Sequence, residues 1–154
     1  MKIKNLLFIL VLILSTAVYS FAQNNTKKDA ASLNKPEIAK SSPAYAEVLL
    51  RKTELLSELE SLLVEYTEDY PKVKELRFET GALQKELDTL LAVNPAESSK
   101  LSAALGKLMV RKCELNTDLW ILLKEYNDQH PNVKRARRKL EIFEASIKDI
   151  LQTK

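Results

Sequence analysis

The chain contains the same segment twice, at a spacing of 60 residues. Residues 51–91 and 111–151 align without a gap, and 14 of the 41 positions are identical. A repeat of this kind is one supersecondary unit used twice, so both copies are expected to adopt the same local fold. The repeat therefore constrains the architecture of the protein far more than it constrains its activity.

The composition favours helices. The 154 residues include only two glycines, and Leu, Glu, Lys and Ala dominate the part of the chain that contains the repeat. These residues have high helix propensity, and no stretch shows the alternation that is typical of a half-buried strand. The sequence predicts an all-α protein.

Apolar residues recur at spacings of three and four in four stretches, two within residues 43–92 and two within residues 99–154. Such a row makes a helix seam that can be buried only against another helix. Lys52 and Lys112 interrupt the seam at equivalent positions of the two copies. A lysine in a seam lowers stability but can specify the register, because its stem can reach outward to solvent.

Each copy contains a proline at the point where its helical pattern breaks. A residue before proline avoids the α conformation, whereas proline itself suits the first turn of a helix. One helix is therefore expected to end and the next to begin here, which gives an antiparallel helical hairpin in each copy. A long helix kinked at each proline is the alternative. The predicted turn residues are Tyr66, Pro71, Val73, Tyr126, His130, Pro131 and Val133.

These boundaries divide the chain into five parts. We expect a signal peptide (1–22), a flexible linker (23–42), helical hairpin 1 (43–92), a loop (93–98) and helical hairpin 2 (99–154). The two tandem antiparallel hairpins are expected to pack as a four-helix bundle or as a coiled-coil pair, because four amphipathic helices in one chain can bury their seams together.

The N-terminus has the order of a secretory signal peptide. Lys2 and Lys4 precede an apolar run over residues 6–14, and Ser20 and Ala22 place small residues at the −3 and −1 positions of a cleavage site. The apolar run is shorter than the roughly 20 residues that span a bilayer. The chain is expected to be exported to the periplasm or secreted, and an N-terminal membrane anchor is the alternative.

The two halves carry opposite charge. Residues 43–92 contain 6 Lys or Arg and 11 Asp or Glu, a net charge of −5, whereas residues 99–154 contain 12 Lys or Arg and 7 Asp or Glu, a net charge of +5. Opposite charges favour docking of hairpin 1 on hairpin 2, or head-to-tail association between copies.

The sequence contains no pattern that predicts an enzyme. His130 is the only histidine and aligns with Tyr70, which indicates a structural role at the turn. Cys113, the only cysteine, aligns with Thr53 and is expected to be a small, partly buried helix residue; an intermolecular disulfide is the alternative. Because no phosphate-binding loop, nucleophile motif or ligand cluster is present, we predict no catalytic, cofactor-binding or metal site.

Two features could contact a partner. The first is a run of exposed cations that could bind an anionic envelope polysaccharide or lipid: Lys134, Arg135, Arg137, Arg138 and Lys139. The second is Trp120, which replaces Glu60 of the other copy and lies beside the predicted seam. A tryptophan there is most often core, and the sharper interpretation is a partner-binding hot spot. Nucleic acid is not an expected partner, because an exported chain rarely meets it.

Residues 62–76 and 122–136 resemble the periplasmic coiled-coil segment of the polysaccharide co-polymerase family, which includes chain-length determinants and exopolysaccharide transport proteins. In that family a Leu-Leu-x-x-Tyr stretch is followed by a His-Pro-x-Val turn and a second heptad helix. His130-Pro131-Asn132-Val133 matches the turn, whereas Tyr70-Pro71-Lys72-Val73 departs from it at its first residue. The resemblance implies a helical hairpin in the envelope and a link to surface polysaccharide, and it implies no catalytic residue.

Together these features predict an exported, non-enzymatic helical scaffold or adaptor of the bacterial envelope that acts through coiled-coil contacts. Its expected partners are envelope proteins or further copies of itself. The alternatives are an accessory role in surface polysaccharide export and binding of anionic envelope polymers through the basic face of the last helix.

Overall fold

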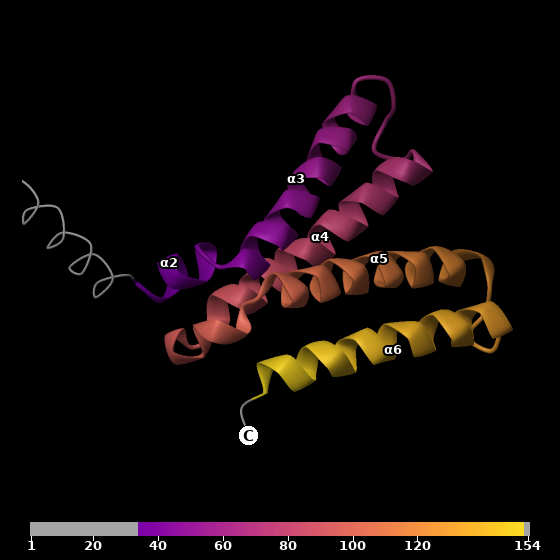
Figure 1. Ribbon diagram of the computed structural model, residues 1–154. Coiled ribbons are helices and arrows are strands. Elements are labelled where there is room, and N and C mark those ends of the chain that lie inside the picture. Colours follow the sequence, from indigo (N-terminus) through magenta and orange to yellow (C-terminus); the bar gives the residue numbers. More distant parts are fainter. Residues whose placement is uncertain (1–33, 153–154) are drawn as a thin grey trace, which may run out of the picture. The chain divides into compact units, whose positions relative to one another are not determined.

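The computed structural model describes residues 34–152, and its regular elements in this range are helices joined by turns (Figure 1). Within this range there is no strand, which confirms the predicted all-α class. The predicted signal peptide and residues 23–33 of the predicted linker lie outside the described residues. The helices are α2 (Lys35–Lys40), α3 (Pro43–Leu63), α4 (Pro71–Ala92), the 3₁₀ helix η2 (Pro95–Lys100), α5 (Ala103–Glu125) and α6 (Pro131–Leu151).

Short polar side chains and prolines begin these helices. The Ser42 hydroxyl accepts a hydrogen bond from the Tyr45 N–H at 3.2 Å, and Pro43 occupies the first turn of α3. Ser102 caps α5 in the same way, through the Leu105 N–H at 3.3 Å. A side-chain acceptor at this position satisfies an N–H group that has no partner inside the helix.

The chain turns at both predicted prolines. The helix before Pro71 ends at Leu63, and the helix before Pro131 ends at Glu125. Each proline lies at the first helical position, where its missing N–H removes no hydrogen bond. The alternative of one long helix kinked at each proline is therefore wrong.

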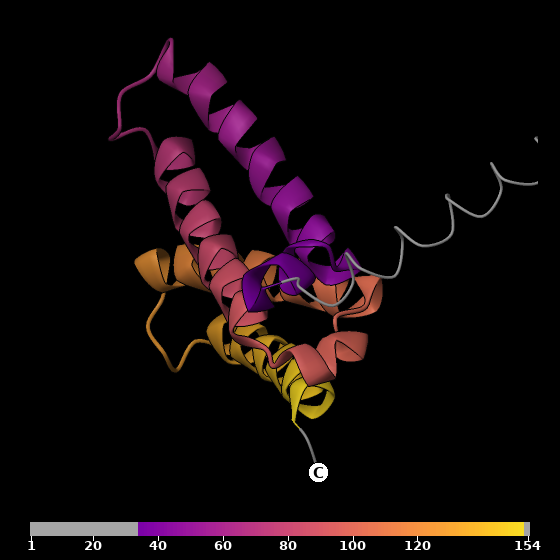
Figure 2. The same cartoon turned by 90° about the vertical axis from the view of Figure 1, so that its left-hand side faces the viewer.

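Helix α5 is the central helix of the unit that begins at Lys35. It packs against α3, α4 and α6, while α3 also packs against α4. A closed four-helix bundle requires each helix to contact two neighbours, and α6 has its extensive contacts with α5 alone. Figure 2 shows the same arrangement, with α6 beside α5 and away from α3.

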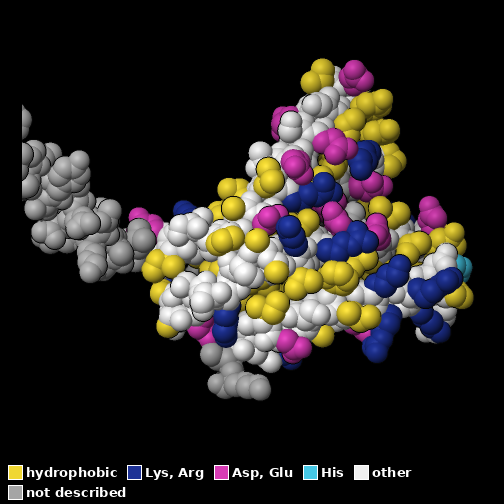
Figure 3. Space-filling view, in the orientation of Figure 1, with side chains coloured by type: hydrophobic (Ala, Val, Ile, Leu, Met, Phe, Trp, Pro, Cys, Tyr) yellow, Lys and Arg dark blue, Asp and Glu magenta, His cyan; other side chains and the backbone are white. Residues whose placement is uncertain are grey.

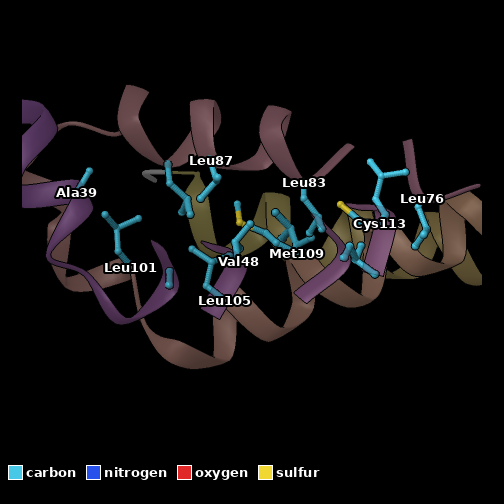
Figure 4. Close-up of a cluster of buried hydrophobic side chains, with 14 of the residues drawn as sticks. Ala39, Val48, Leu76, Leu83, Leu87, Leu101, Leu105, Met109 and Cys113 are labelled. Carbon is cyan, nitrogen blue, oxygen red and sulfur yellow. The ribbon is translucent and has the colours of Figure 1, made fainter. Parts of the chain in front are cut away.

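The core follows the predicted seams and extends beyond them. On α4 one row of residues at spacings of three and four is buried along the whole helix: Val73, Leu76, Thr80, Leu83, Leu87 and Leu90. On α5 a second face is buried as well, formed by Gly106, Met109, Cys113 and Thr117. Figure 4 shows Met109 and Cys113 among core side chains of α3 and α4. A smaller cluster joins α5 to α6 through Leu115, Leu119, Val133 and Leu140.

Two predicted connections contain helical structure. Within the expected linker 23–42, Lys35–Lys40 forms α2, which contacts α4 and η2 and buries Ala39 to 2% exposure. Pro36 suits the first turn of such a helix. The expected loop 93–98 is largely η2, capped by the Asn94 side chain, and α5 begins at Ala103 rather than at residue 99.

Candidate functional site

The two turns have the same internal contacts. Tyr66 stacks on Tyr70 with ring centroids 4.1 Å apart, and Tyr126 stacks on His130 at the same separation. Val73 and Val133, which follow the prolines, are both fully buried. The aromatic pair covers the mouth of each turn while the valine begins the returning seam.

A salt bridge closes each turn on its outer side. Arg77 pairs with Glu68, and the equivalent Arg137 pairs with Asp128, with 2.6 Å between Nη2 and Oδ1 in the second pair. The bond from Arg77 lowers the pKa of the Glu68 carboxyl below its ordinary value. At the second turn, His130 Nδ1 also accepts a hydrogen bond from the Asn132 N–H at 3.2 Å, which caps α6. His130 is thus positioned by structural contacts.

The basic run of α6 is exposed. Lys134, Arg135, Arg137, Arg138 and Lys139 all face solvent, and Ala136 between them is half-buried. Three of these cations have nearby partners: Arg137 with Asp128, Arg138 with Glu141 at 3.0 Å, and Arg135 with the Asn132 side chain at 2.9 Å. Figure 3 shows dark blue side chains gathered near the turn between α5 and α6.

A groove of about 490 Å³ lies between α5 and α6 beside this run. Its floor is apolar and includes Leu115, Leu122 and Ala136. Its rim carries three cations and one acid: Arg111, Arg135, Lys139 and Asp118. The groove is therefore suited to an elongated apolar surface with negative charge at its edges, or to an anionic polymer.

Trp120 is engaged within the chain. Its indole stacks on the Phe78 ring of α4 with centroids 4.8 Å apart, and the Lys124 ammonium lies 3.1 Å from its ring centroid. The residue is half-buried. These contacts favour the interpretation of Trp120 as a core residue that packs between α4 and α5. The sequence alone did not identify Phe78 as its stacking partner.

Ion pairs link helices α3, α4 and α5. Arg51 on α3 contacts Glu79 on α4 at 3.1 Å and Glu114 on α5 at 3.7 Å, and Lys112 on α5 pairs with Glu86 on α4. Glu79 is only 8% exposed, and its burial raises its pKa although Arg51 opposes the shift. Of these three pairs, only Lys112–Glu86 joins a cation of the basic half to an acid of the acidic half; Arg51–Glu114 has the opposite sense, and Arg51–Glu79 lies within residues 43–92.

Cys113 is 1% exposed and packs in the core between α4 and α5. Burial, with the nearby Glu86 carboxylate, raises the pKa of its thiol to about 12. Because the thiolate is the form that attacks electrophiles and binds metals, burial and the raised pKa disfavour both reactions at Cys113. Across residues 34–152, no group of His, Cys, Asp and Glu is arranged to hold a metal ion.

None of the helices in the described part of the chain is both long enough and apolar enough to cross a bilayer. Comparison with known protein families, characterised proteins and solved structures finds no match to this chain.

Proposed function

We propose that this protein is an exported, non-enzymatic helical scaffold of the bacterial envelope that acts through contacts of its helix surfaces. The observation that carries the proposal is a set of exposed apolar side chains on helices whose other faces are already packed. Leu49 and Leu50 on α3 are 42% and 59% exposed, and Ile142 on α6 is 56% exposed. An exposed apolar side chain on a helix can serve as an anchor for a partner helix.

The proposed architecture is two hairpins made from one duplicated unit, residues 43–92 and 99–154. It is supported by the matching turns and by the ion pairs from Arg51 and Lys112 that connect the copies. Because α6 has its extensive contacts with α5 alone, the second hairpin retains an open side. A partner helix laid on that side would meet an apolar floor with a charged rim, as in helix-in-groove recognition.

Export is supported by the order of charge, apolar run and small residues in the first 22 positions. We expect the protein from a periplasmic or secreted fraction to begin at Gln23 when its N-terminus is sequenced. Full-length protein in the cytosolic fraction would contradict the proposed location.

The interaction is tested by crosslinking inside the cell. A photoreactive amino acid is placed at Ile142, which lies on α6 one turn beyond the groove residue Lys139. The control carries it at Lys85, which is also exposed but lies on α4. The scaffold proposal expects a defined crosslinked band from position 142 and none from position 85. Equal, diffuse labelling from both positions would contradict a specific surface.

The groove cations favour one second candidate, the binding of an anionic envelope polymer. Neutralising Arg135 and Lys139 to Gln is expected to weaken retention on a heparin column and to reduce its salt dependence. The control neutralises Lys85 and Lys148, two exposed lysines outside the groove, with the same change in net charge. Equal loss in both variants would show a general charge effect and would remove support for a site.

A further inference from the structure

The two copies of the repeat contact each other through unlike faces. Helix α5 of the second copy uses Met109, Cys113 and Trp120, which lie against α3 and α4. The first copy receives them with a different set of positions, which includes Arg51 on α3 and Phe78 on α4. Contacts between unlike faces leave one face of each kind unused at the two ends of a tandem array.

The face that α5 uses for docking is also present on α3, and there it is exposed. A shift of 60 residues converts Met109 and Cys113, both buried, into Leu49 and Thr53, both exposed. The same shift places Leu56, 37% exposed, and Glu60 on this face. We define the outer α3 face as Leu49, Thr53, Leu56 and Glu60.

The receiving face is likewise repeated and exposed on the second copy. Phe78, Glu79 and Ala82 of α4 correspond to Arg138, Lys139 and Ile142 of α6, and Arg51 of α3 corresponds to Arg111 of α5. The Arg138 side chain is 77% exposed and that of Arg111 is 52% exposed. We define the outer α6 face as Arg111, Arg138, Lys139 and Ile142.

We infer that this chain associates head to tail with further copies of itself, the outer α3 face of one copy docking on the outer α6 face of the next. The inference rests on the proposed scaffold function, because it names the partner of the same exposed surfaces. Since the contact is heterologous, each added copy presents a new free face, and assembly continues beyond a dimer unless the rotation closes a ring.

The charges of the two faces are complementary. Within one chain, the interface between the two repeats has Trp120 stacked on Phe78. Between two chains, the equivalent positions hold Glu60 of one chain and Arg138 of the other, which have opposite charge. The outer α6 face has three cations, and it extends from the half of the chain with net charge +5. The outer α3 face belongs to the half with net charge −5.

A second equivalence supports the same pairing. Arg51 contacts Glu114 at 3.7 Å across the interface between the two repeats of one chain. The corresponding pair between two chains is Arg111 of one with Glu54 of the other. Inside the chain Arg51 is also neutralised by Glu79, whereas the residue equivalent to Glu79 is Lys139. Within the chain Arg111 pairs with Glu114 at 2.7 Å and Arg138 with Glu141 at 3.0 Å, so the positive charge left on the outer α6 face for an acidic surface to balance is mainly that of Lys139.

One difference between the two repeats makes the contact between two chains looser than the contact between the repeats of one chain. Gly106 lets α5 approach Ala44 closely, and its counterpart on α3 is Ala46. The additional methyl group requires wider spacing of the helices, so fewer core contacts form. We therefore expect association that depends on protein concentration and that weakens as salt is raised.

The test uses two variants that each block one face, made in the protein with its native N-terminus and purified as the cell processes it. Leu49→Asp places a charge on the outer α3 face, and Ile142→Asp places one on the outer α6 face. Both positions are exposed, so both variants are expected to fold, with helicity and melting temperature measured by circular dichroism. Sedimentation velocity then gives the mass of each sample.

The unmodified protein is expected to increase in mass with concentration and to pass the mass of a dimer. Each variant alone is expected to remain a monomer. Their equimolar mixture is expected to reach twice the monomer mass and stop, because one intact face of each kind remains for a single contact.

Three results would overturn the inference: an unmodified protein that stays monomeric at all concentrations, a variant that dimerises alone, or association that requires an added anionic polymer. A monomer that still gives the crosslinked band from position 142 with another envelope protein would reject self-association and retain the scaffold function. A protein that neither self-associates nor gives a crosslinked band from position 142 would reject both proposals.

Discussion

A Cβ atom added to Gly106 would lie 2.8 Å from the backbone carbonyl oxygen of Ala44. The two residues mark a close approach of α5 to α3, near the start of both helices. A contact under 3.0 Å to backbone cannot be relieved by a rotamer change, so α5 must move away if the glycine is replaced. A glycine at position 106 is therefore required for the two repeats of one chain to pack this closely.

Gly106→Ala is expected to destabilise the protein by about 1–3 kcal/mol, since overpacking exceeds the gain in helix propensity. Gly81→Ala is the matched control, because a Cβ there has no atom within 4 Å. That control is expected to stabilise the protein by up to about 1 kcal/mol. Urea denaturation followed by circular dichroism measures both, and equal effects of the two substitutions would contradict the close approach.

Trp120→Ala is expected to lower the free energy of unfolding by about 2–4 kcal/mol, because the indole loses its stack on Phe78 and its contact with Lys124. Glu60→Ala changes the equivalent exposed position of α3 and is expected to alter the free energy of unfolding by less than about 0.5 kcal/mol. Chemical denaturation measures both variants. A Trp120→Ala variant as stable as the original protein would show that the stack contributes nothing to docking.

The repeat and the helical periodicity predicted the all-α class and the places where the long helices end and begin. The turns at Pro71 and Pro131 could be predicted because proline restricts the residue before it and suits the start of a helix, wherever the chain packs. The seam of α4 could be predicted because one apolar row faces one neighbouring pair of helices.

The position of α5 between three helices could not be predicted in the same way. A single seam accounts for one buried face, whereas the second face of α5 combines Met109 with the small residues Gly106 and Cys113 and does not form a continuous row of large apolar residues. Helix α2 was missed because a six-residue polar segment has little helical preference alone and is stabilised by the burial of Ala39. The candidate surfaces could be located only from the structure, in which the Leu49 side chain is exposed and that of its counterpart Met109 is buried.

The thiol of Cys113 is expected to be inert in the folded protein. Its burial and a pKa of about 12 leave almost no thiolate at pH 8. Labelling with a disulfide reagent at pH 8 should therefore be at least about 10³-fold slower than in urea, with a rate that follows global unfolding. Fast labelling, or a disulfide-linked dimer on a non-reducing gel of the native protein, would contradict the packing of Cys113 in the core.

Glu79 and Glu68 are expected to titrate on opposite sides of the ordinary glutamate pKa of 4.5. Burial raises the pKa of Glu79, so the folded state holds that proton more tightly than the unfolded chain, and ionisation of Glu79 opposes folding as pH rises through its folded pKa. The pKa of Glu68 is lowered by Arg77, so its contribution to stability is present above pH 4.5 and is lost as pH falls through the folded pKa. Carboxyl carbon NMR titration measures both groups, and Arg51→Met is expected to raise the pKa of Glu79 further.

The two turns allow one final comparison, at His130. His130→Ala removes the stack on Tyr126 and the cap on the Asn132 N–H, and is expected to cost about 1–2 kcal/mol. His130→Tyr introduces the residue that the first copy has as Tyr70, which stacks on Tyr66 but makes no side-chain cap. Because this variant keeps the stack and loses only the cap, its free energy of unfolding should lie between those of the original protein and His130→Ala. Thermal denaturation of the three proteins in one buffer measures the series; a His130→Tyr variant less stable than His130→Ala would show that the two turns are not equivalent.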